Sequence, residues 1–170
     1  MNSTGLKAAA AIALAIVSAA SGCRPPQKPR VAGRGPSPAA NTVSAGQLTL
    51  TIHVPKRDFA LGEEVPVTVV ARNLAKKPVR FTAPTNTICL LRIWRHNGLA
   101  WEHVKRYPPA EMRTQLPWKL DAQSSRTINR RVVVEPDWPT GEILRLTAEL
   151  NGRGKLAPGV SIRVRPRAER

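Results

Sequence analysis

The chain has 170 residues, a formal net charge of +16 and two cysteines. This length favours one domain with extensions. Two cysteines are too few for a small secreted domain that depends on a disulfide framework. The positive charge suits anionic polymers and lipid headgroups as partners, but the sequence has no nucleic-acid reading motif, so we expect no nucleic-acid partner.

The first 22 residues differ from the rest of the chain. A short polar head containing Lys7 precedes a run of thirteen residues, Ala8 to Ala20, which is apolar apart from Ser18. A helix that crosses a bilayer needs about 20 apolar residues. The short run followed by small residues is typical of a secretory signal. Residues 1–22 are therefore predicted to be a signal peptide.

The end of this segment, Ala20-Ser21-Gly22-Cys23, resembles the lipobox of bacterial lipoproteins, with alanine where leucine is commonest. The resemblance implies cleavage between Gly22 and Cys23, a diacylglyceryl group on the Cys23 thiol, and acylation of the new amine. Two or more acyl chains hold a protein stably at a membrane, at about 0.8 kcal/mol for each buried CH2. The implied location is a bacterial cell envelope. Arg24 replaces the aspartate that often signals inner-membrane retention, which favours the outer membrane in a two-membrane host.

The segment after the cysteine is rich in proline and poor in large apolar side chains. Residues 24–46 contain five prolines. Such a stretch buries too little surface to offset the entropy of ordering it. We predict that residues 23–46 form the lipidated cysteine and a flexible linker, that residues 47–166 form the domain, and that residues 167–170 form a basic tail.

Alternation of apolar and polar residues recurs through the domain. In the first example, Leu48, Leu50, Ile52 and Val54 lie on one face of an extended chain. Period-two patterns between turn residues predict strands. They occur at 47–54, 65–73, 78–83, 88–95, 99–105, 126–134, 142–150 and 159–165. About seven or eight such strands predict an all-β, antiparallel, Ig-like β-sandwich, with a small barrel as the structural alternative.

Two of these predicted strands flank Asn97-Gly98. This dipeptide favours a tight two-residue hairpin, because both residues tolerate positive φ. A hairpin closed there would place Trp101 opposite Trp94 and His103 opposite Arg92. We therefore expect a cross-strand tryptophan pair beside basic side chains.

Other residues resemble the first hairpin of Ig-like bacterial envelope domains: Phe59, Gly62-Glu63, a strand ending at Asn73, and Pro78. The later order of segments is similar to the bacterial intracellular proteinase inhibitor domain. The sequence departs from that family at Pro139-Thr140-Gly141, where the family often has Pro-Gly, and it lacks a tyrosine common in the next strand. The resemblance implies an Ig-like sandwich and, as one alternative function, inhibition of a protease by a loop such as Arg106 to Trp118.

No arrangement of residues predicts catalysis, a metal site or a cofactor. The three histidines are His53, His96 and His103, and they do not form a ligand pattern. Cys89 lies in an apolar run and is predicted to be a buried, inert side chain. The candidate binding surface comprises Arg92, Trp94, Trp101, Arg106 and Trp118.

We therefore expect a membrane-anchored, non-enzymatic binding or scaffolding protein whose partner is an unknown envelope protein or an anionic polymer. The alternatives are a proteinase-inhibitor-like domain and a basic module that binds anionic envelope polymer or lipid.

Overall fold

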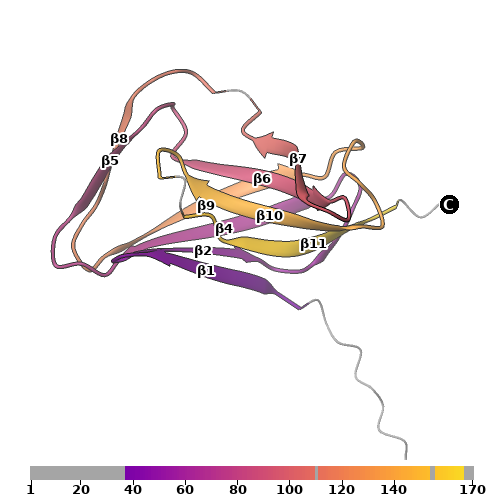
Figure 1. Ribbon diagram of the computed structural model, residues 1–170, viewed down its shortest axis with the longest axis horizontal. Coiled ribbons are helices and arrows are strands. Elements are labelled where there is room, and N and C mark those ends of the chain that lie inside the picture. The colour runs from indigo at the N-terminus through magenta and orange to yellow at the C-terminus, as the bar shows by residue number, and fades with distance from the viewer. Residues whose placement is uncertain (1–36, 110, 154–155, 167–170) are drawn as a thin grey trace, which may run out of the picture. The chain divides into compact units, whose positions relative to one another are not determined.

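The computed structural model describes residues 37–109, 111–153 and 156–166 (Figure 1). These residues lie in one compact unit, Gly33–Arg170, and form an all-β sandwich, as predicted. The strands are β1 (Ala39–Ala45), β2 (Leu48–Val54), β3 (Asp58–Ala60), β4 (Glu64–Asn73), β5 (Val79–Ala83), β6 (Cys89–His96), β7 (Trp101–Tyr107), β8 (Leu116–Leu120), β9 (Ser125–Val133), β10 (Ile143–Leu150) and β11 (Gly159–Arg165). Among the described residues there is no helix long and apolar enough to cross a membrane.

One layer is a four-stranded sheet in the order β1-β2-β4-β9, and all its pairings are antiparallel. The alternation that predicted β2 and β4 places one face of each strand inside. Ile52 pairs with Val69, for example, and both side chains are fully buried. Period-two alternation therefore sets both the strand and the face that it buries.

The other layer is a five-stranded sheet in the order β3-β11-β10-β6-β7. Its pairings are antiparallel except for the short parallel pairing of β3 with β11. The sequence order predicts β6 beside β7, but only the fold brings β10 against β6. The side chains of β10 therefore lie beside those of β6 on the outer face of the sheet.

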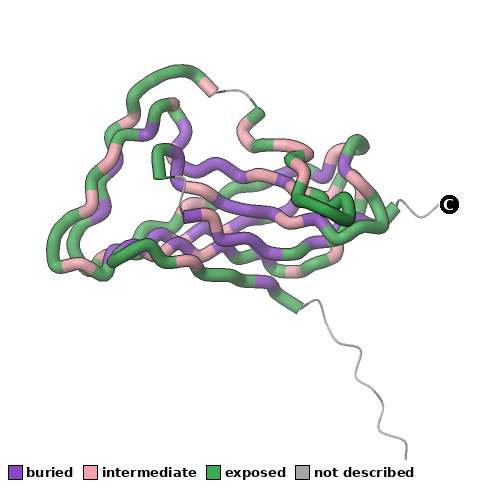
Figure 2. The backbone as a smooth tube through the Cα atoms, viewed as in Figure 1, coloured by how far each residue is buried: buried purple, intermediate pink, exposed green. Residues whose placement is uncertain are grey.

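The core lies between the two sheets, and buried positions follow the inward faces of the strands (Figure 2). Leu50, Val67, Leu91, Leu146 and Ile162 are at most 1% exposed. Each fully buried aliphatic side chain contributes about 1.5–3 kcal/mol relative to exposure. The sandwich is therefore stabilised by aliphatic packing between its layers.

Strands β5 and β8 pair with each other and extend beyond the ends of both sheets as a two-stranded arm (Figure 1). Phe81 lies opposite Trp118 in the register, with the ring centroids 4.8 Å apart. The Arg126 guanidinium lies 5.8 Å from the centroid of the Trp118 ring. The Arg153 guanidinium lies 5.5 Å from the centroid of the Phe81 ring. The arm therefore has an aromatic centre of its own, covered by two arginines.

Asn73, at the end of β4, is fully buried and ties this end of the sandwich together. Its amide nitrogen donates to the carbonyls of Lys77 at 2.9 Å and Asp121 at 2.9 Å, and its Oδ1 accepts from the backbone of Ala75 at 3.0 Å. A buried amide needs such partners to offset its desolvation. Asn73, which ends the second strand predicted from the sequence, thus has a structural role.

The structure corrects the predicted start of the domain. Residues Ala39–Ala45 lie within the predicted flexible linker, but they form β1 and pair along the whole of β2. The segment lacks apolar alternation, so its order comes from backbone pairing and from side chains such as Asn41, whose Nδ2 donates to the Gly159 carbonyl at 2.9 Å. The predictions for residues 1–36, including Gly22 and Cys23, and for the tail 167–170 concern residues outside the described part.

Candidate functional site

Three of the predicted binding residues lie together on the outer face of the five-stranded sheet. Arg92, Trp94 and Trp101 line an open groove of about 390 Å³. Strand β10 and the segment before β11 complete the lining with Arg145, Thr147, Glu149 and Ala157. A volume near this value falls within the range of about 300–1,000 Å³ that is typical of small-ligand sites.

Trp94 forms the floor of the groove. Its indole N–H donates to the Thr147 hydroxyl at 2.9 Å, and the His103 ring packs edge-on against it with the centroids 5.3 Å apart. Trp94 is half-buried, and Thr147 is buried. These contacts fix the indole plane before any ligand arrives.

Trp101 forms one wall and is 42% exposed. The His96 ring packs edge-on against it at 5.2 Å, and the Arg145 guanidinium lies 5.8 Å from its ring centroid. Arg145 reaches this position across Gly159, where a Cβ would lie 2.6 Å from Arg145 Nε. A larger residue at position 159 would therefore displace the Arg145 side chain from this place.

Arg92 supplies a second positive charge. Its Nε lies 3.3 Å from Glu149 Oε2, without hydrogen-bond geometry to any acceptor in the described residues. Arg106 is exposed and lies directly opposite Arg92 across the β6–β7 pair. Two like charges directly opposite on one face repel each other and favour an anion between them.

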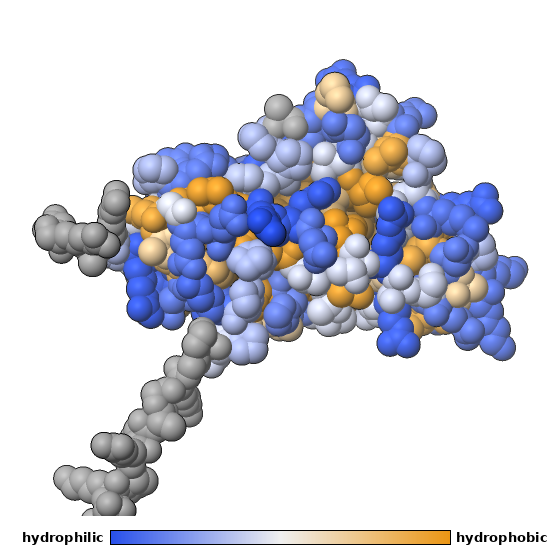
Figure 3. Space-filling model, turned by 180° about the vertical axis from the view of Figure 1, so that it is seen from behind, coloured by the Kyte–Doolittle hydropathy of each residue, from blue (hydrophilic) through white to orange (hydrophobic). Residues whose placement is uncertain are grey.

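The wider surface also carries positive charge. Arg163 and Arg165 are exposed on β11, beside the β10 strand of the groove. Hydrophilic residues cover most of the side seen in Figure 3, with hydrophobic residues visible between them. Scattered arginines of this kind attract anionic ligands over distances of about one Debye length, 8–10 Å.

The hairpin that carries the groove differs from its prediction. Trp94 pairs with His103 and His96 pairs with Trp101, with a bulge between Ile93 and Trp94. The expected pairs of Trp101 with Trp94 and of His103 with Arg92 are therefore wrong. The two tryptophans are diagonal neighbours, so each is free to contact a histidine and a residue of β10.

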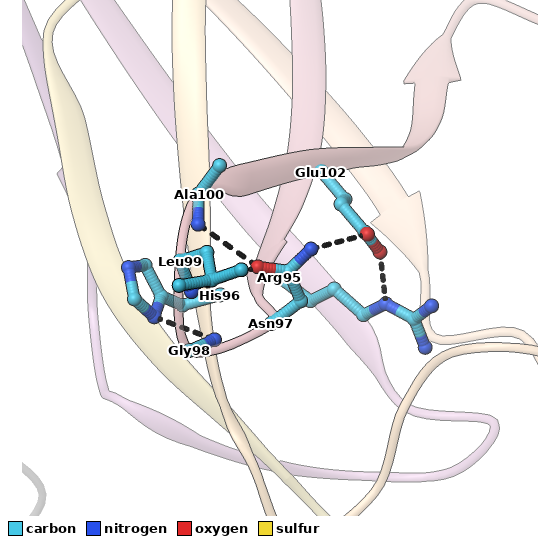
Figure 4. Close-up of polar contacts among 7 residues, drawn as sticks. All are labelled: Arg95, His96, Asn97, Gly98, Leu99, Ala100 and Glu102. Atoms are coloured by element: carbon cyan, nitrogen blue, oxygen red, sulfur yellow. Dashed lines mark hydrogen bonds and ion pairs between the residues drawn. The ribbon is translucent and has the colours of Figure 1, made fainter.

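The turn explains the shifted register (Figure 4). The Asn97 backbone N–H donates to the Ala100 carbonyl at 3.1 Å, and its Oδ1 accepts from the N–H groups of Leu99 and Ala100 at 3.0 and 2.8 Å. Among residues 97–100 of the turn, only Gly98 has a positive φ, of 96°. The loop thus spans four residues instead of two, because the asparagine side chain caps a wider turn.

Glu102 reinforces the same turn. It accepts from Asn97 Nδ2 at 2.5 Å and from Arg95 Nε at 3.0 Å. The hydrogen bond from Asn97, followed by that from Arg95, lowers the pKa of the Glu102 carboxyl group. Trp101 lies between Ala100 and Glu102 in the chain. The hydrogen bonds of these two neighbours therefore hold Trp101 at a fixed position against the groove.

Strand β7 is an edge strand, and a polar network holds its far end. Tyr107 donates its hydroxyl hydrogen to Glu135 Oε1 at 2.8 Å and accepts from Trp138 Nε1 at 3.1 Å. Lys105 binds Glu135 and also Asp137, the latter at 2.9 Å. The hydrogen bonds to Glu135 and Asp137 raise the pKa of Lys105, and burial together with the Glu135 bond raises the pKa of Tyr107 to about 12.

The other predicted residues lie elsewhere. Trp118 is 3% exposed on β8, inside the arm, so it is not part of the groove. Arg106 adjoins the groove but does not line it. Sequence reasoning missed Arg145, Thr147 and Glu149, because their place beside β6 depends on long-range pairing. Two signals in the sequence could have pointed to these residues: the alternation of apolar and polar residues in β10, and the glycine at position 159 in β11.

The remaining candidates for chemistry are dispersed. Cys89 is fully buried, as predicted, and burial raises its pKa to about 11. A thiol in this state is a poor nucleophile at neutral pH. His53 is exposed on β2, in the opposite sheet from His96 and His103. Within the described residues, no three His, Cys, Asp or Glu side chains are grouped as a metal site would require.

Comparisons with known proteins define the fold and nothing more specific. No protein-family model and no curated sequence matches the chain. Among solved structures it is similar to Spo0M, a sporulation control protein from Bacillus subtilis, with a TM-score of 0.51 and 14% identity, over 71% of this chain and 50% of that one. It also matches part of a β-glucosidase from Listeria innocua, with a TM-score of 0.43 and 13% identity, over 76% of this chain and 16% of that one.

The chain therefore spans about half the length of Spo0M. Identity this low shows a shared β-sandwich fold and transfers no function.

Proposed function

We propose that this protein is a lipid-anchored bacterial envelope protein whose β-sandwich is a non-enzymatic binding domain. The observation that carries the proposal is the groove, in which two tryptophans and two arginines from three strands are held in place before binding. Preorganised aromatic and arginine side chains are the residues that most often dominate binding energy. The proposed tether, Cys23 with its linker, would hold the domain at the membrane.

Contacts within the groove support binding over catalysis. The Trp94 indole and the Thr147 hydroxyl are engaged with each other, and His103 packs edge-on against Trp94. A general base must lie within hydrogen-bond reach of the proton that it removes, and its partners must orient it for that transfer. The one carboxylate of the lining, Glu149, lies 3.3 Å from Arg92 Nε, and the other groups are rings, a hydroxyl and guanidinium groups, which recognise a ligand by shape and charge.

Photo-crosslinking in intact membranes tests this function. A photoreactive side chain at Ser161 stands beside the groove, opposite Arg145 in the register of β10 and β11. A matched probe at Ser125 lies on the outer face of the other sheet, opposite Arg72. The proposal predicts a ligand adduct from the first position and none from the second.

A second candidate function, protease inhibition, is favoured by the segment between β7 and β8. The Met112 backbone binds Asn86 twice: its N–H donates to Asn86 Oδ1 at 3.3 Å and its carbonyl accepts from the Asn86 N–H at 3.1 Å. Met112 is 67% exposed, and Arg113 beside it is also exposed. A loop fixed by two hydrogen bonds to a neighbouring segment loses little conformational entropy when a partner binds it.

This candidate predicts that the protein slows a trypsin-like serine protease at stoichiometric amounts, and that Arg113→Ala removes the effect. Such proteases recognise an arginine in a pocket that carries a negative charge. Arg72→Ala, on the outer face of the four-stranded sheet, is the matched control and should leave inhibition unchanged. The absence of slowing across a panel of serine proteases would end the idea.

A further inference from the structure

We propose that the groove on the five-stranded sheet binds a glycan that carries carboxylate groups, one acidic sugar unit at a time. This inference rests on the proposed function, because it names the ligand class of the same site. It depends on three features of the lining. These are an exposed indole ring, one more positive than negative charge, and polar groups that can form hydrogen bonds with sugar hydroxyls.

The indole supplies a flat apolar surface. Trp101 is 42% exposed, and its ring is fixed by His96 and Arg145. Exposed aromatic rings supply contact area at a low cost in conformational entropy. The C–H groups on one face of a sugar ring match such a surface, since they are apolar and carry partial positive charge that the ring face attracts.

The charges favour a single negative group. The lining contains the guanidinium groups of Arg92 and Arg145 and the carboxylate of Glu149, which leaves one unit of positive charge. A planar guanidinium binds a carboxylate with two parallel hydrogen bonds. The groove is therefore matched to one carboxylate for each bound unit.

The remaining polar groups suit hydroxyls. Glu149 is half-buried and can accept hydrogen bonds from sugar hydroxyl groups. Arg92 Nε is buried 3.3 Å from Glu149 Oε2, so donation to a ligand falls to the terminal nitrogens of the Arg92 guanidinium group. Exposed Ser161 and Arg163 continue the polar surface along β11, so that a polymer can extend beyond the groove.

The test is a titration of the full-length, lipid-anchored protein in detergent with an oligogalacturonate of defined length. The comparison ligands are a neutral malto-oligosaccharide of the same length and inorganic polyphosphate. We expect the oligogalacturonate to bind, the neutral oligosaccharide to bind at least tenfold more weakly, and Trp101→Ala and Arg145→Gln each to raise the Kd about tenfold. Arg72→Gln, on the outer face of the other sheet, removes the same charge and should change the Kd less than twofold.

Polyphosphate separates this site from general attraction to a basic protein. Its binding should weaken with salt and should be unaffected by Trp101→Ala. Absent binding of the oligogalacturonate, equal binding of the neutral oligosaccharide, or an unchanged Kd in Trp101→Ala would each overturn the inference. If the oligogalacturonate fails to bind while the probe at residue 161 crosslinks to an envelope protein, the glycan is wrong and the proposed binding function stands.

Discussion

Replacing Cys23 with serine should abolish incorporation of labelled fatty acid into the protein and remove its acyl-dependent attachment to membranes. The expected loss is complete, because the serine hydroxyl does not replace the thiol that the lipobox resemblance implies as the acylation site. Membrane binding by acyl chains grows by about 0.8 kcal/mol for each buried CH2, so removal of all chains removes the whole anchor. Labelling with radioactive palmitate, followed by fractionation of the cells, measures both effects.

Cys89 provides the matched control, since it is the other cysteine of the chain. It is fully buried in the core, where no lipid-transfer enzyme reaches it. Cys89→Ala should retain the label and the membrane attachment. Label that persists in Cys23→Ser, or that disappears in Cys89→Ala, would contradict the assignment of the anchor.

Replacing Trp138 with alanine should lower the free energy of unfolding by about 3–5 kcal/mol, the usual range for a buried aromatic side chain. Trp138 is 2% exposed, its ring lies 6.1 Å from that of Tyr107, and its Nε1 donates to the Tyr107 hydroxyl. The substitution leaves a cavity and also removes a partner from the network that holds β7. Urea unfolding followed by far-UV circular dichroism should show a lower midpoint with a similar slope.

Trp101→Ala is the control of the same residue type. Trp101 is 42% exposed and lies on the outer face, so its removal should cost less than about 1 kcal/mol. Equal losses in the two variants would show that Trp138 does not anchor the β7 end of the sandwich. A large loss in Trp101→Ala would instead show that the groove residue is structural.

The alternation of apolar and polar residues predicted most of the strands, because this pattern lies within each short segment and does not depend on residues distant in sequence. All eight expected strands are present, and Leu48, Leu50, Ile52 and Val54 face inward together. The structure adds β1, β3 and β8. These lack a clear alternation: β3 has three residues, and β8 contains Pro117. Strands β3 and β8 pair with strands distant in sequence, β11 and β5, whereas β1 pairs with the adjacent β2 through its backbone.

The register of the hairpin could not be read from Asn97-Gly98 alone. Whether this dipeptide forms a two-residue or a four-residue turn depends on the Asn97 side chain, which here accepts from Leu99 and Ala100. A shift of this kind changes which side chains meet across the strands. The predicted tryptophan pair was lost for this reason.

The candidate site was predicted in part. Arg92, Trp94 and Trp101 lie on neighbouring strands of one hairpin, so that sequence proximity brought them together in the prediction. Trp118 is distant because its strand belongs to the arm, and its apolar ring packs on Phe81. The β10 side of the groove depends on pairing between residues about fifty positions apart, such as Trp94 and Arg145, which no local pattern encodes.

Photo-crosslinking from residues 161 and 125 in membranes, with Cys23 intact, tests the binding function most directly. Both positions are serines that lie exposed on strands, one beside the groove and one on the opposite sheet. We predict an adduct from position 161 that disappears when Trp101→Ala and Arg145→Gln are combined, and no adduct from position 125. Equal adducts from both positions, an adduct that survives the combined substitutions, or no adduct from position 161 would contradict the proposal that this groove is the binding site.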